Sequence, residues 1–269
     1  MPGVGETIDR RALLKAGGLL SLGGVLAACT GSTQPKAQPP KTTTPAPTTA
    51  STTTAAPTPS AVGLLDQAGT CTLTPATIAG PTWFDAAAVR SDIRDGRPGV
   101  PLDLAFRVEK AATCTPIPNA VVDLWQCDAL GVYSGFAGAK PGQGGSAGGK
   151  DKYGDAESAA TDADRWLRGT QVTGADGVVS FGSIYPGWYP TRTAHLHLKV
   201  HLDNATALTT QLFFDDAVSD AVYAANAPYN QHPGRDTRNT RDEFYKATAQ
   251  LHLAQGVAGW LGAIVLAVR

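Results

Sequence analysis

The chain has 269 residues and is almost neutral, with 22 basic and 23 acidic residues and a formal net charge of −1 at pH 7. Proteins that bind nucleic acid through its phosphates carry a clustered excess of lysine and arginine, so no nucleic-acid partner is expected. The length and the 42% hydrophobic content allow one domain with a substantial core.

Residues 1–28 have the pattern of an export signal. Arg10 and Arg11 open a twin-arginine motif, and the apolar stretch at 17–27 is too short to span a membrane stably. Small residues directly precede Cys29, as in the lipobox of bacterial lipoproteins, in which the cysteine is lipidated after cleavage. The alternative is a plain cleavable signal with an incidental cysteine. We predict twin-arginine export and a lipid anchor at Cys29 as the sole membrane contact, on the outer face of the cytoplasmic membrane or the cell surface.

Residues 29–61 are predicted to be a disordered tether. The stretch 30–60 has 11 threonines and 7 prolines among its 31 residues, without acidic or aromatic side chains. Such a composition cannot bury enough apolar surface to offset the entropy lost on ordering. Stalks rich in threonine and proline are often O-glycosylated. Residues 62–269 then remain as a single domain.

Three cysteines lie in that domain, at Cys71, Cys114 and Cys127. In an oxidising compartment one disulfide and one spare thiol are expected. An extended strand between Cys114 and Cys127 would hold their Cα atoms beyond the limit of about 7 Å for a disulfide unless the loop folds back. A pairing that involves Cys71 is therefore preferred, and we predict Cys71 with Cys127.

The domain contains many short apolar segments separated by turn residues. Strands are predicted at 102–109, 120–126, 166–173, 178–184, 193–202, 208–214, 244–253 and 260–268. The turn at 175–177 is expected to join its two flanking strands as a hairpin. One minor helix is predicted at 215–225, and the glycine-rich loop at 136–160 is a candidate rim over a site. Because helix–strand units do not repeat, the pattern favours an all-β sandwich of mixed or antiparallel strands with long loops.

His195 and His197 alternate along one predicted strand, with Tyr189 and Arg192 just upstream. Residues i and i+2 of a strand point to the same face about 6–7 Å apart, so two imidazoles can converge on one ion. Imidazole alone does not identify the metal, since it suits zinc, copper, iron and nickel. A tyrosine that binds as phenolate would favour Fe(III) over Zn(II), because phenolate is a hard donor with a parent pKa of about 10. His201 has the same parity and is interpreted as a satisfied polar residue.

Three separated blocks carry a further pattern. They are Pro-Asn-Ala-Val-Val-Asp-Leu-Trp-Gln continuing to a tyrosine at 118–133, Arg-Gly-Thr-Gln continuing to Tyr-Pro-Gly-Trp-Tyr at 168–189, and Arg-Thr-Ala-His-Leu-His at 192–197. A Thr-x-x-Gly-Pro segment at 77–81 precedes them. In this order the blocks resemble the intradiol ring-cleavage dioxygenases, nonhaem Fe(III) enzymes of catechol catabolism, over about residues 74–214.

The resemblance implies roles that spacing alone cannot assign. The implied metal ligands are Tyr133, Tyr189, His195 and His197, with Tyr189 and His197 axial. Catalytic roles are implied for Arg192, Gln211 and Tyr189, the last as a ligand that leaves the metal during turnover. Substrate contacts are implied for Gly80, Pro81 and Trp83. The implied fold is a transthyretin-like (prealbumin-like) sandwich, and the implied reaction is cleavage of a catechol by O2 to a cis,cis-muconate-type product.

Two other functions use the same residues. A surface-anchored, non-catalytic sandwich module would keep the fold without turnover, but the joint presence of all four ligand types and Arg192 argues against it. A zinc hydrolase could use the two histidines with a carboxylate such as Asp203, and would explain neither tyrosine. Thr82 and Trp83 stand where many relatives have paired aromatics, and a helical N-terminal dimerisation segment is missing. The particular catechol and the oligomeric state therefore stay open.

Overall fold

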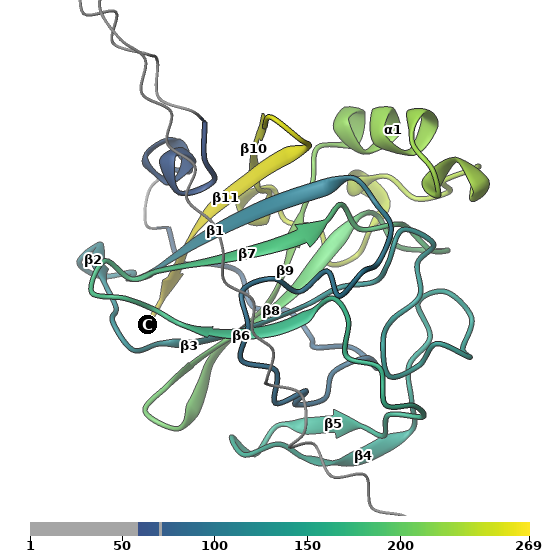
Figure 1. The fold of residues 1–269 in the computed structure, drawn as a ribbon. Helices are drawn as coiled ribbons and strands as arrows, with labels where there is room; N and C mark the ends of the chain where they lie inside the picture. Colours follow the sequence, from purple (N-terminus) through teal and green to yellow (C-terminus); the bar gives the residue numbers. More distant parts are fainter. Residues whose placement is uncertain (1–58, 70–71) are drawn as a thin grey trace, which may run out of the picture. The chain divides into compact units, whose positions relative to one another are not determined.

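The computed structural model describes residues 59–69 and 72–269, and strands dominate them (Figure 1). The predicted export signal, the anchor at Cys29 and nearly all of the tether lie outside the described residues. The described part starts with a short 3-10 helix, Val62–Gln67, that packs on the first sheet. Among the described residues, no helix has the length and apolar character needed to cross a membrane.

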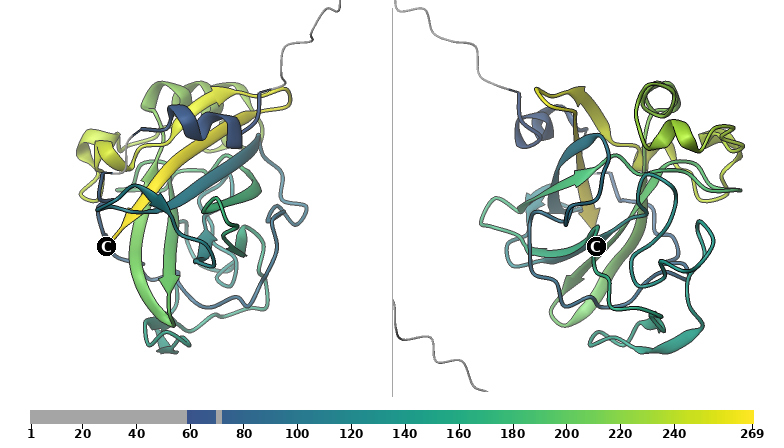
Figure 2. Two further views of the ribbon diagram at one scale, coloured as in Figure 1. Left: turned by 90° about the vertical axis from the view of Figure 1, so that its left-hand side faces the viewer. Right: turned by 45° about the vertical axis from the view of Figure 1, so that its right-hand side comes forward.

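The first sheet is mixed and has five strands. They are β10 (His252–Gln255), β11 (Trp260–Val268), β1 (Pro101–Lys110), β2 (Thr115–Pro116) and β7 (Val178–Ile184). β1 runs parallel to β11 and antiparallel to β2 and β7. Figure 2 shows β11, which ends at the C-terminus, lying alongside β1.

The second sheet is antiparallel and has four strands. In spatial order they are β6 (Arg168–Val172), β3 (Val121–Trp125), β8 (His195–Leu202) and β9 (Ala205–Phe213). A separate hairpin, β4 (Ala147–Lys150) with β5 (Ala156–Ser158), forms within the long loop predicted at 136–160. The all-β sandwich expected from the strand pattern is confirmed.

The main core lies between the two large sheets. Leu104 and Phe106 of β1 contribute to the same buried cluster as Leu196, Leu198 and Val200 of β8. Because side chains alternate along a strand, the residues between these leucines point to the opposite face of the second sheet. That opposite face is also covered, so nearly every residue of β8 is buried. The strand is therefore apolar toward the core and polar toward the loops that cover it.

The one α-helix in the described part of the chain, α1 (Asp216–Ala225), confirms the prediction at 215–225. Asp215 caps it, since its carboxylate accepts hydrogen bonds from the backbone N–H groups of Ala217 and Val218 at 2.8 and 3.1 Å. An acidic cap satisfies N–H groups that have no partner within the helix and opposes the helix dipole. The following strand prediction is less successful, because 244–253 contains a 3-10 turn, Ala247–Ala249, and only the start of β10.

The predicted hairpin at 175–177 is wrong. The turn exists, with Gly177 at φ +72°, but β6 pairs with β3 of the second sheet while β7 pairs with β1 of the first. The chain thus crosses between sheets at this turn. A local turn signal does not determine which strand each arm will pair with, because that choice depends on burying both apolar faces.

The predicted disulfide between Cys71 and Cys127 is also wrong. Cys127 is a free, buried thiol that lies 3.6 Å from the carbonyl oxygen of Gly187. Cys114 is the disulfide-bonded cysteine, and its partner lies outside the described residues. Cys127 lies two residues after the end of β3 and is enclosed by aromatic side chains, whereas Cys114 lies in the turn after β1.

Candidate metal centre

The register of the second sheet places four functional side chains in one row. Arg168 of β6 lies opposite Trp125 of β3, Trp125 lies opposite His197 of β8, and His197 lies opposite Gln211 of β9. Directly opposed residues share a face, with Cβ atoms about 4.5–5.5 Å apart. His195 projects from the same face two residues earlier. The sheet itself therefore brings a cation, two imidazoles and an amide into one layer.

Two tyrosine oxygens meet the two imidazoles above this row. Tyr133 Oη lies 3.4 Å from Tyr189 Oη, 3.4 Å from His195 Nε2 and 3.0 Å from His197 Nε2. His195 Nε2 lies 3.1 Å from Tyr189 Oη and 3.1 Å from His197 Nε2. Four atoms from Tyr133, Tyr189, His195 and His197 thus converge, as the resemblance implied.

Hydrogen bonding alone does not explain this cluster. The Nδ1 atom of His195 lies 2.7 Å from the carbonyl oxygen of Thr193 and donates to it, so Nε2 has one lone pair and no proton. That single lone pair faces three polar atoms within 3.4 Å. Ligand atoms about 2.1 Å from one ion stand about 3.0 Å apart at a right angle and about 3.4 Å apart at the tetrahedral angle. The spacings therefore suit four ligands around one ion.

Burial holds all four groups in their neutral forms when no ion is present. Burial lowers the pKa of His195 to about 3, with a further contribution from Arg192, and lowers that of His197 well below its ordinary value. Burial likewise raises the pKa of Tyr189 to about 12 and raises that of Tyr133 far above 10. Neutral imidazole is the form that binds metals, while each phenol must lose its proton to bind as phenolate.

A turn around Asp128 positions Tyr133. The Asp128 carboxylate accepts hydrogen bonds from the backbone N–H groups of Leu130 and Val132 at 2.9 and 3.0 Å and pairs with Arg97. Its carbonyl oxygen accepts from Gly187 N–H at 3.0 Å, which ties the Tyr133 loop to the segment that leads to Tyr189. The two tyrosines, 56 residues apart, are therefore held by one local network.

Arg192 and Gln211 lie together beside the donor atoms. Arg192 Nε donates to Asp242 at 2.9 Å, and Arg192 Nη2 donates to the amide oxygen of Gln211. Gln211 is anchored in turn by Nε2, which donates to the carbonyl oxygen of Ile78 at 3.1 Å. The Arg192 side chain is 12% exposed, so its charge is fixed and only partly solvated. Sequence reasoning missed Asp242, because nothing in its local pattern links it to residue 192.

Of the three residues implied as substrate contacts, Gly80 and Pro81 lie at the site, whereas Trp83 lies behind one of the donor residues. A Cβ at Gly80 would meet the His197 ring at 3.6 Å, so this glycine lies against a donor residue. The carbonyl of Pro81 is in close contact with Gly144, so the loop predicted as a rim does cover this part of the site. Trp83 is only 3% exposed and packs against Trp125 with ring centroids 4.6 Å apart and the two ring planes tilted by 47°. Trp83 therefore supports the ring behind His197, since Trp125 stacks on that imidazole at 4.9 Å.

The other histidine of β8 is satisfied by protein groups, which confirms its interpretation. His201 Nε2 lies 2.8 Å from an Asp123 carboxylate oxygen and Nδ1 lies 2.9 Å from Thr206 Oγ1. Asp203 follows β8 at its far end, about 20 Å or more from His195 at about 3.3 Å per residue. Among the described residues, no three His, Cys, Asp or Glu side chains form a metal-binding group. A zinc hydrolase with a carboxylate ligand is therefore not supported.

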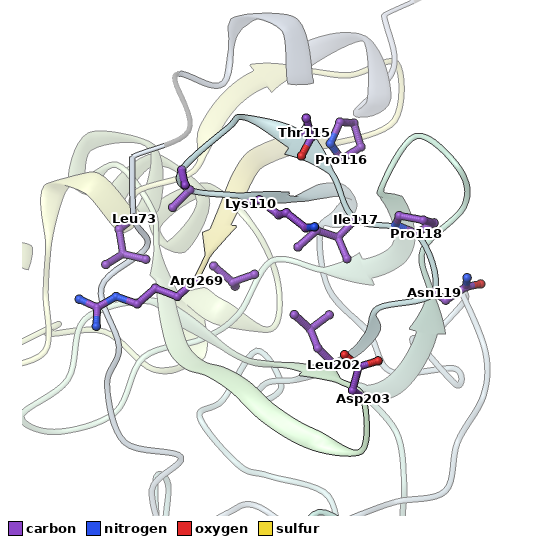
Figure 3. Close-up of a pocket in the computed structure, with 13 residues that line it drawn as sticks. Leu73, Lys110, Thr115, Pro116, Ile117, Pro118, Asn119, Leu202, Asp203 and Arg269 are labelled. Carbon is purple, nitrogen blue, oxygen red and sulfur yellow. The ribbon is translucent and has the colours of Figure 1, made fainter.

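A cavity of about 820 Å³ lies at that far end rather than at the donor atoms (Figure 3). Its wall includes Lys110, Ile117, Leu202, Asp203 and Arg269. The cavity is separated from His195 by the length of β8 and shares no residue with the donor cluster. This cavity therefore does not mark the position of the donor cluster.

The fold and the two-tyrosine, two-histidine cluster together define the class of intradiol ring-cleavage dioxygenases, and comparison with known proteins agrees. No family model matches the sequence. An intradiol ring-cleavage dioxygenase from Tetranychus urticae is 30% identical with a TM-score of 0.64, over 74% of this chain and 95% of that one. A second dioxygenase structure is 32% identical with a TM-score of 0.65 over the same shares. The chain belongs to the intradiol ring-cleavage dioxygenase family.

Curated relatives are more distant. Catechol 1,2-dioxygenase 1 of Acinetobacter lwoffii is 29% identical over 203 residues, which cover 64% of this chain and 58% of that protein. The chain spans between 58% and 64% of the length of the curated relatives that it matches.

Proposed function

We propose that residues 62–269 are an iron(III)-dependent dioxygenase that cleaves a catechol-type diol with O2 between its two hydroxyl-bearing carbons, giving a cis,cis-muconate-type product. The convergence of two phenol oxygens and two imidazole nitrogens within 3.0–3.4 Å of one another carries this proposal. The catecholic substrate follows from the printed activities of the relatives, and the particular catechol stays open.

The donor set fits ferric iron better than zinc. Both phenols have raised pKa values without a metal, so only a strongly Lewis-acidic ion displaces their protons near neutral pH. Two phenolates also supply two negative charges to the ion, which suits a trivalent hard cation. Tyr133, Tyr189, His195 and His197 would hold the iron. Bound ferric iron supplies the Lewis acidity that makes a coordinated catecholate reactive toward O2.

The two tyrosines have different surroundings, which suggests different duties. Tyr133 is 1% exposed and is held by the Asp128 turn, whereas Tyr189 is 8% exposed and begins a tight turn that ends at Arg192. Tyr189 is therefore the better candidate to leave the metal. Since its pKa without a metal is about 12, the Tyr189 oxygen would accept and hold a proton from the incoming diol.

Arg192 would stabilise negative charge that develops on the substrate. Asp242 and Gln211 fix its guanidinium from two sides, and the Phe244 ring lies 4.7 Å from its Cζ. A cation held in place in a partly dry site needs no reorganisation when charge appears, so it acts more strongly than one in water. Gln211 sets the direction of the guanidinium through Nη2.

The cellular location is a separate proposal. The twin-arginine motif, the lipobox-like residues before Cys29 and the threonine-rich stretch support export to the outer face of the membrane on a lipidated tether. The disulfide at Cys114 agrees with an oxidising compartment. Substitution Cys29→Ala in the native host should release the protein from the membrane fraction. If that variant stays membrane-bound, the anchor is not at Cys29.

The reaction is tested with the full chain purified after ferric loading. We expect about one iron per chain, a red-brown phenolate-to-iron absorption band, and O2 consumption with at least one member of a panel of catechol, protocatechuate, hydroxyquinol and lignin-derived diphenols. Tyr133→Phe should lose most of the band. Colourless protein with stoichiometric zinc would overturn the iron site. A coloured protein that consumes no O2 with any diol would favour the non-catalytic module.

A further inference from the structure

Arg168 is a buried cation that the proposed reaction does not use. Its residue is 2% exposed, and its pKa falls to about 9 because burial disfavours the charged form, which leaves it protonated at neutral pH. Burying an unpaired charge costs several kcal/mol unless another group compensates it. The fold therefore bears a cost to keep a guanidinium at this position.

No carboxylate in the described part of the chain forms an ion pair with this guanidinium. None of the ion pairs among residues 59–69 and 72–269 includes Arg168, and Asp162 acts on it only from a greater distance. Arg168 Nε donates to Ser134 Oγ at 2.9 Å, and Nη2 donates to the carbonyl oxygens of Ser134 and Thr82 at 2.8 and 2.9 Å. The buried Nη1 has no hydrogen-bond partner within residues 59–69 and 72–269. These contacts need N–H groups, and a neutral amide could supply some of them.

The guanidinium is placed beside the donor atoms. Its main contacts are with Ser134, the residue after Tyr133, and its strand neighbour Trp125 stacks on His197 at 4.9 Å. Charge on Tyr133 would raise the pKa of Arg168 and so oppose the lowering by burial, which puts the two side chains within electrostatic reach of each other. Arg168 thus lies at one end of the row, bonded to the residue that follows Tyr133, whereas Arg192 lies beside Gln211 at the other end.

We propose that Arg168 is the fixed countercharge of the Tyr133 phenolate and acts through it to set the electronic properties of the metal centre. This inference rests on the proposed ferric site. The hydrogen bonds of Arg168 go to Ser134 and Thr82 and to none of the four donor residues, so it would act as a positioning residue. The phenolate supplies the negative charge that the buried guanidinium lacks, and the guanidinium lowers the energy of the phenolate electrons.

The colour of the centre reports this effect. Its absorption band moves electron density from the phenolate to the iron, and a cation on the phenolate side stabilises the donor more than the acceptor. Removing the charge should therefore shift the band to longer wavelength. The loss of positive charge should also lower the ferric/ferrous reduction potential, because it stabilises the ferric state relative to the ferrous state.

Two substitutions separate the charge from the hydrogen bonds. Arg168→Gln keeps an N–H donor and loses the charge, while Arg168→Lys keeps the charge and loses the planar fork. With the full chain loaded with iron, we expect the Gln variant to show the longer-wavelength band and lower potential, and the Lys variant to stay close to the parent. Equal shifts in both variants, or no shift in the Gln variant, would overturn the proposal.

Arg165→Gln is the matched control. Arg165 and Arg168 both lie over the Phe84 ring, with Cζ atoms 4.5 and 4.0 Å from its centroid, but Arg165 is partly exposed. Its loss should leave the band in place, because solvent screens its charge. A shift with Arg165→Gln as large as with Arg168→Gln would mean that any nearby charge has this effect, which overturns a specific role.

Ser134→Ala keeps the proposal testable if Arg168→Gln does not fold. This variant removes one hydrogen bond to Arg168 and retains the charge, so its band and that of Arg168→Lys should match the parent. A shift in either would assign the effect to contacts instead of charge. A colourless parent enzyme would overturn the ferric site itself, whereas a coloured parent with unshifted variants would overturn only the role of Arg168.

Discussion

The two halves of β8 present polar side chains to the same face of one sheet but meet different surroundings. His195 and His197 occupy the first half, and Lys199 and His201 occupy the second, each no more than 2% exposed. Alternation along the strand places all four on the side away from the leucine core. Composition and burial therefore do not distinguish the two halves.

Their partners do. Lys199 Nζ pairs with Asp155 and lies 3.5 Å from Asp151, and His201 lies 2.8 Å from Asp123. Each basic group of the second half thus lies next to at least one carboxylate. Both carboxylates near Lys199 come from the β4–β5 hairpin region. The Nε2 atoms of the two imidazoles in the first half face each other and two phenol oxygens. In the second half, the ion pairs hold a loop against the sheet. In the first half, lone pairs converge without a neighbouring opposite charge, which suits this cluster to bind an ion.

The sharpest way to break this comparison is to remove one histidine from each half. His197→Ala should lower iron affinity by more than about 100-fold, the upper range for losing a group that only supports a ligand, and should abolish O2 uptake. Metal analysis after dialysis and oxygen-electrode assays measure both effects. Retention of stoichiometric iron by His197→Ala would show that His197 is not a ligand.

His201→Asn is the matched substitution in the second half. It loses the hydrogen bond to Asp123 and should destabilise the fold by about 1–2 kcal/mol, since a buried acceptor is left without its donor. The iron content should stay at the parent level. Urea unfolding of the iron-free proteins gives the stability, and a loss of iron comparable to that of His197→Ala would mean that the halves are not independent.

Lys199→Met tests whether the second half is structural. Asp151 is fully buried and Asp155 partly so, and both would lose their cation. Because Asp151 still accepts hydrogen bonds from N–H groups of Trp83, Tyr153 and Asp155, we expect the free energy of unfolding to fall by about 2–3 kcal/mol, at or below the lower limit of the roughly 3–5 kcal/mol for a broken buried pair. Iron content should be unchanged.

The control for this change is Lys152→Met. Lys152 lies in the same hairpin region and pairs with Asp85 at 3.3 Å, but its side chain is 58% exposed. An exposed ion pair contributes roughly 0–1 kcal/mol, so this variant should unfold close to the parent. Similar losses in Lys152→Met and Lys199→Met would show that burial does not set the difference.

Some of this contrast could be predicted from the sequence. The alternation at 193–202 indicates a strand with His195 and His197 on one face, and the apolar run at 260–268 coincides with β11. Tyr133 could be assigned only by resemblance, because it reaches the histidines through a turn fixed by Asp128. The spacing of residues along the sequence carries no information about such a tertiary contact.

The errors have the same origin. Cys127 was expected in a disulfide, yet it is enclosed among the aromatic residues that support the donors. The turn at 175–177 has hairpin chemistry, but its two arms join different sheets. Pairing partners distant in the sequence decide each case, and local patterns carry no information about them.

The last prediction concerns the pH dependence of the stability of the iron-free protein. Since the folded-state pKa of His195 is about 3 and the unfolded value is near 6.5, the unfolded chain binds more protons between these values. Stability is therefore fully present above about pH 6.5 and falls as the pH drops toward 3, by up to about 1.4 kcal/mol per pH unit for this group. His197 acts in the same direction. Urea unfolding of the iron-free protein from pH 7 to 5 should show this slope, and His195→Asn should reduce it. If both proteins give the same slope, the first half of β8 does not hold His195 in its neutral form, and the contrast between the two halves loses its electrostatic basis.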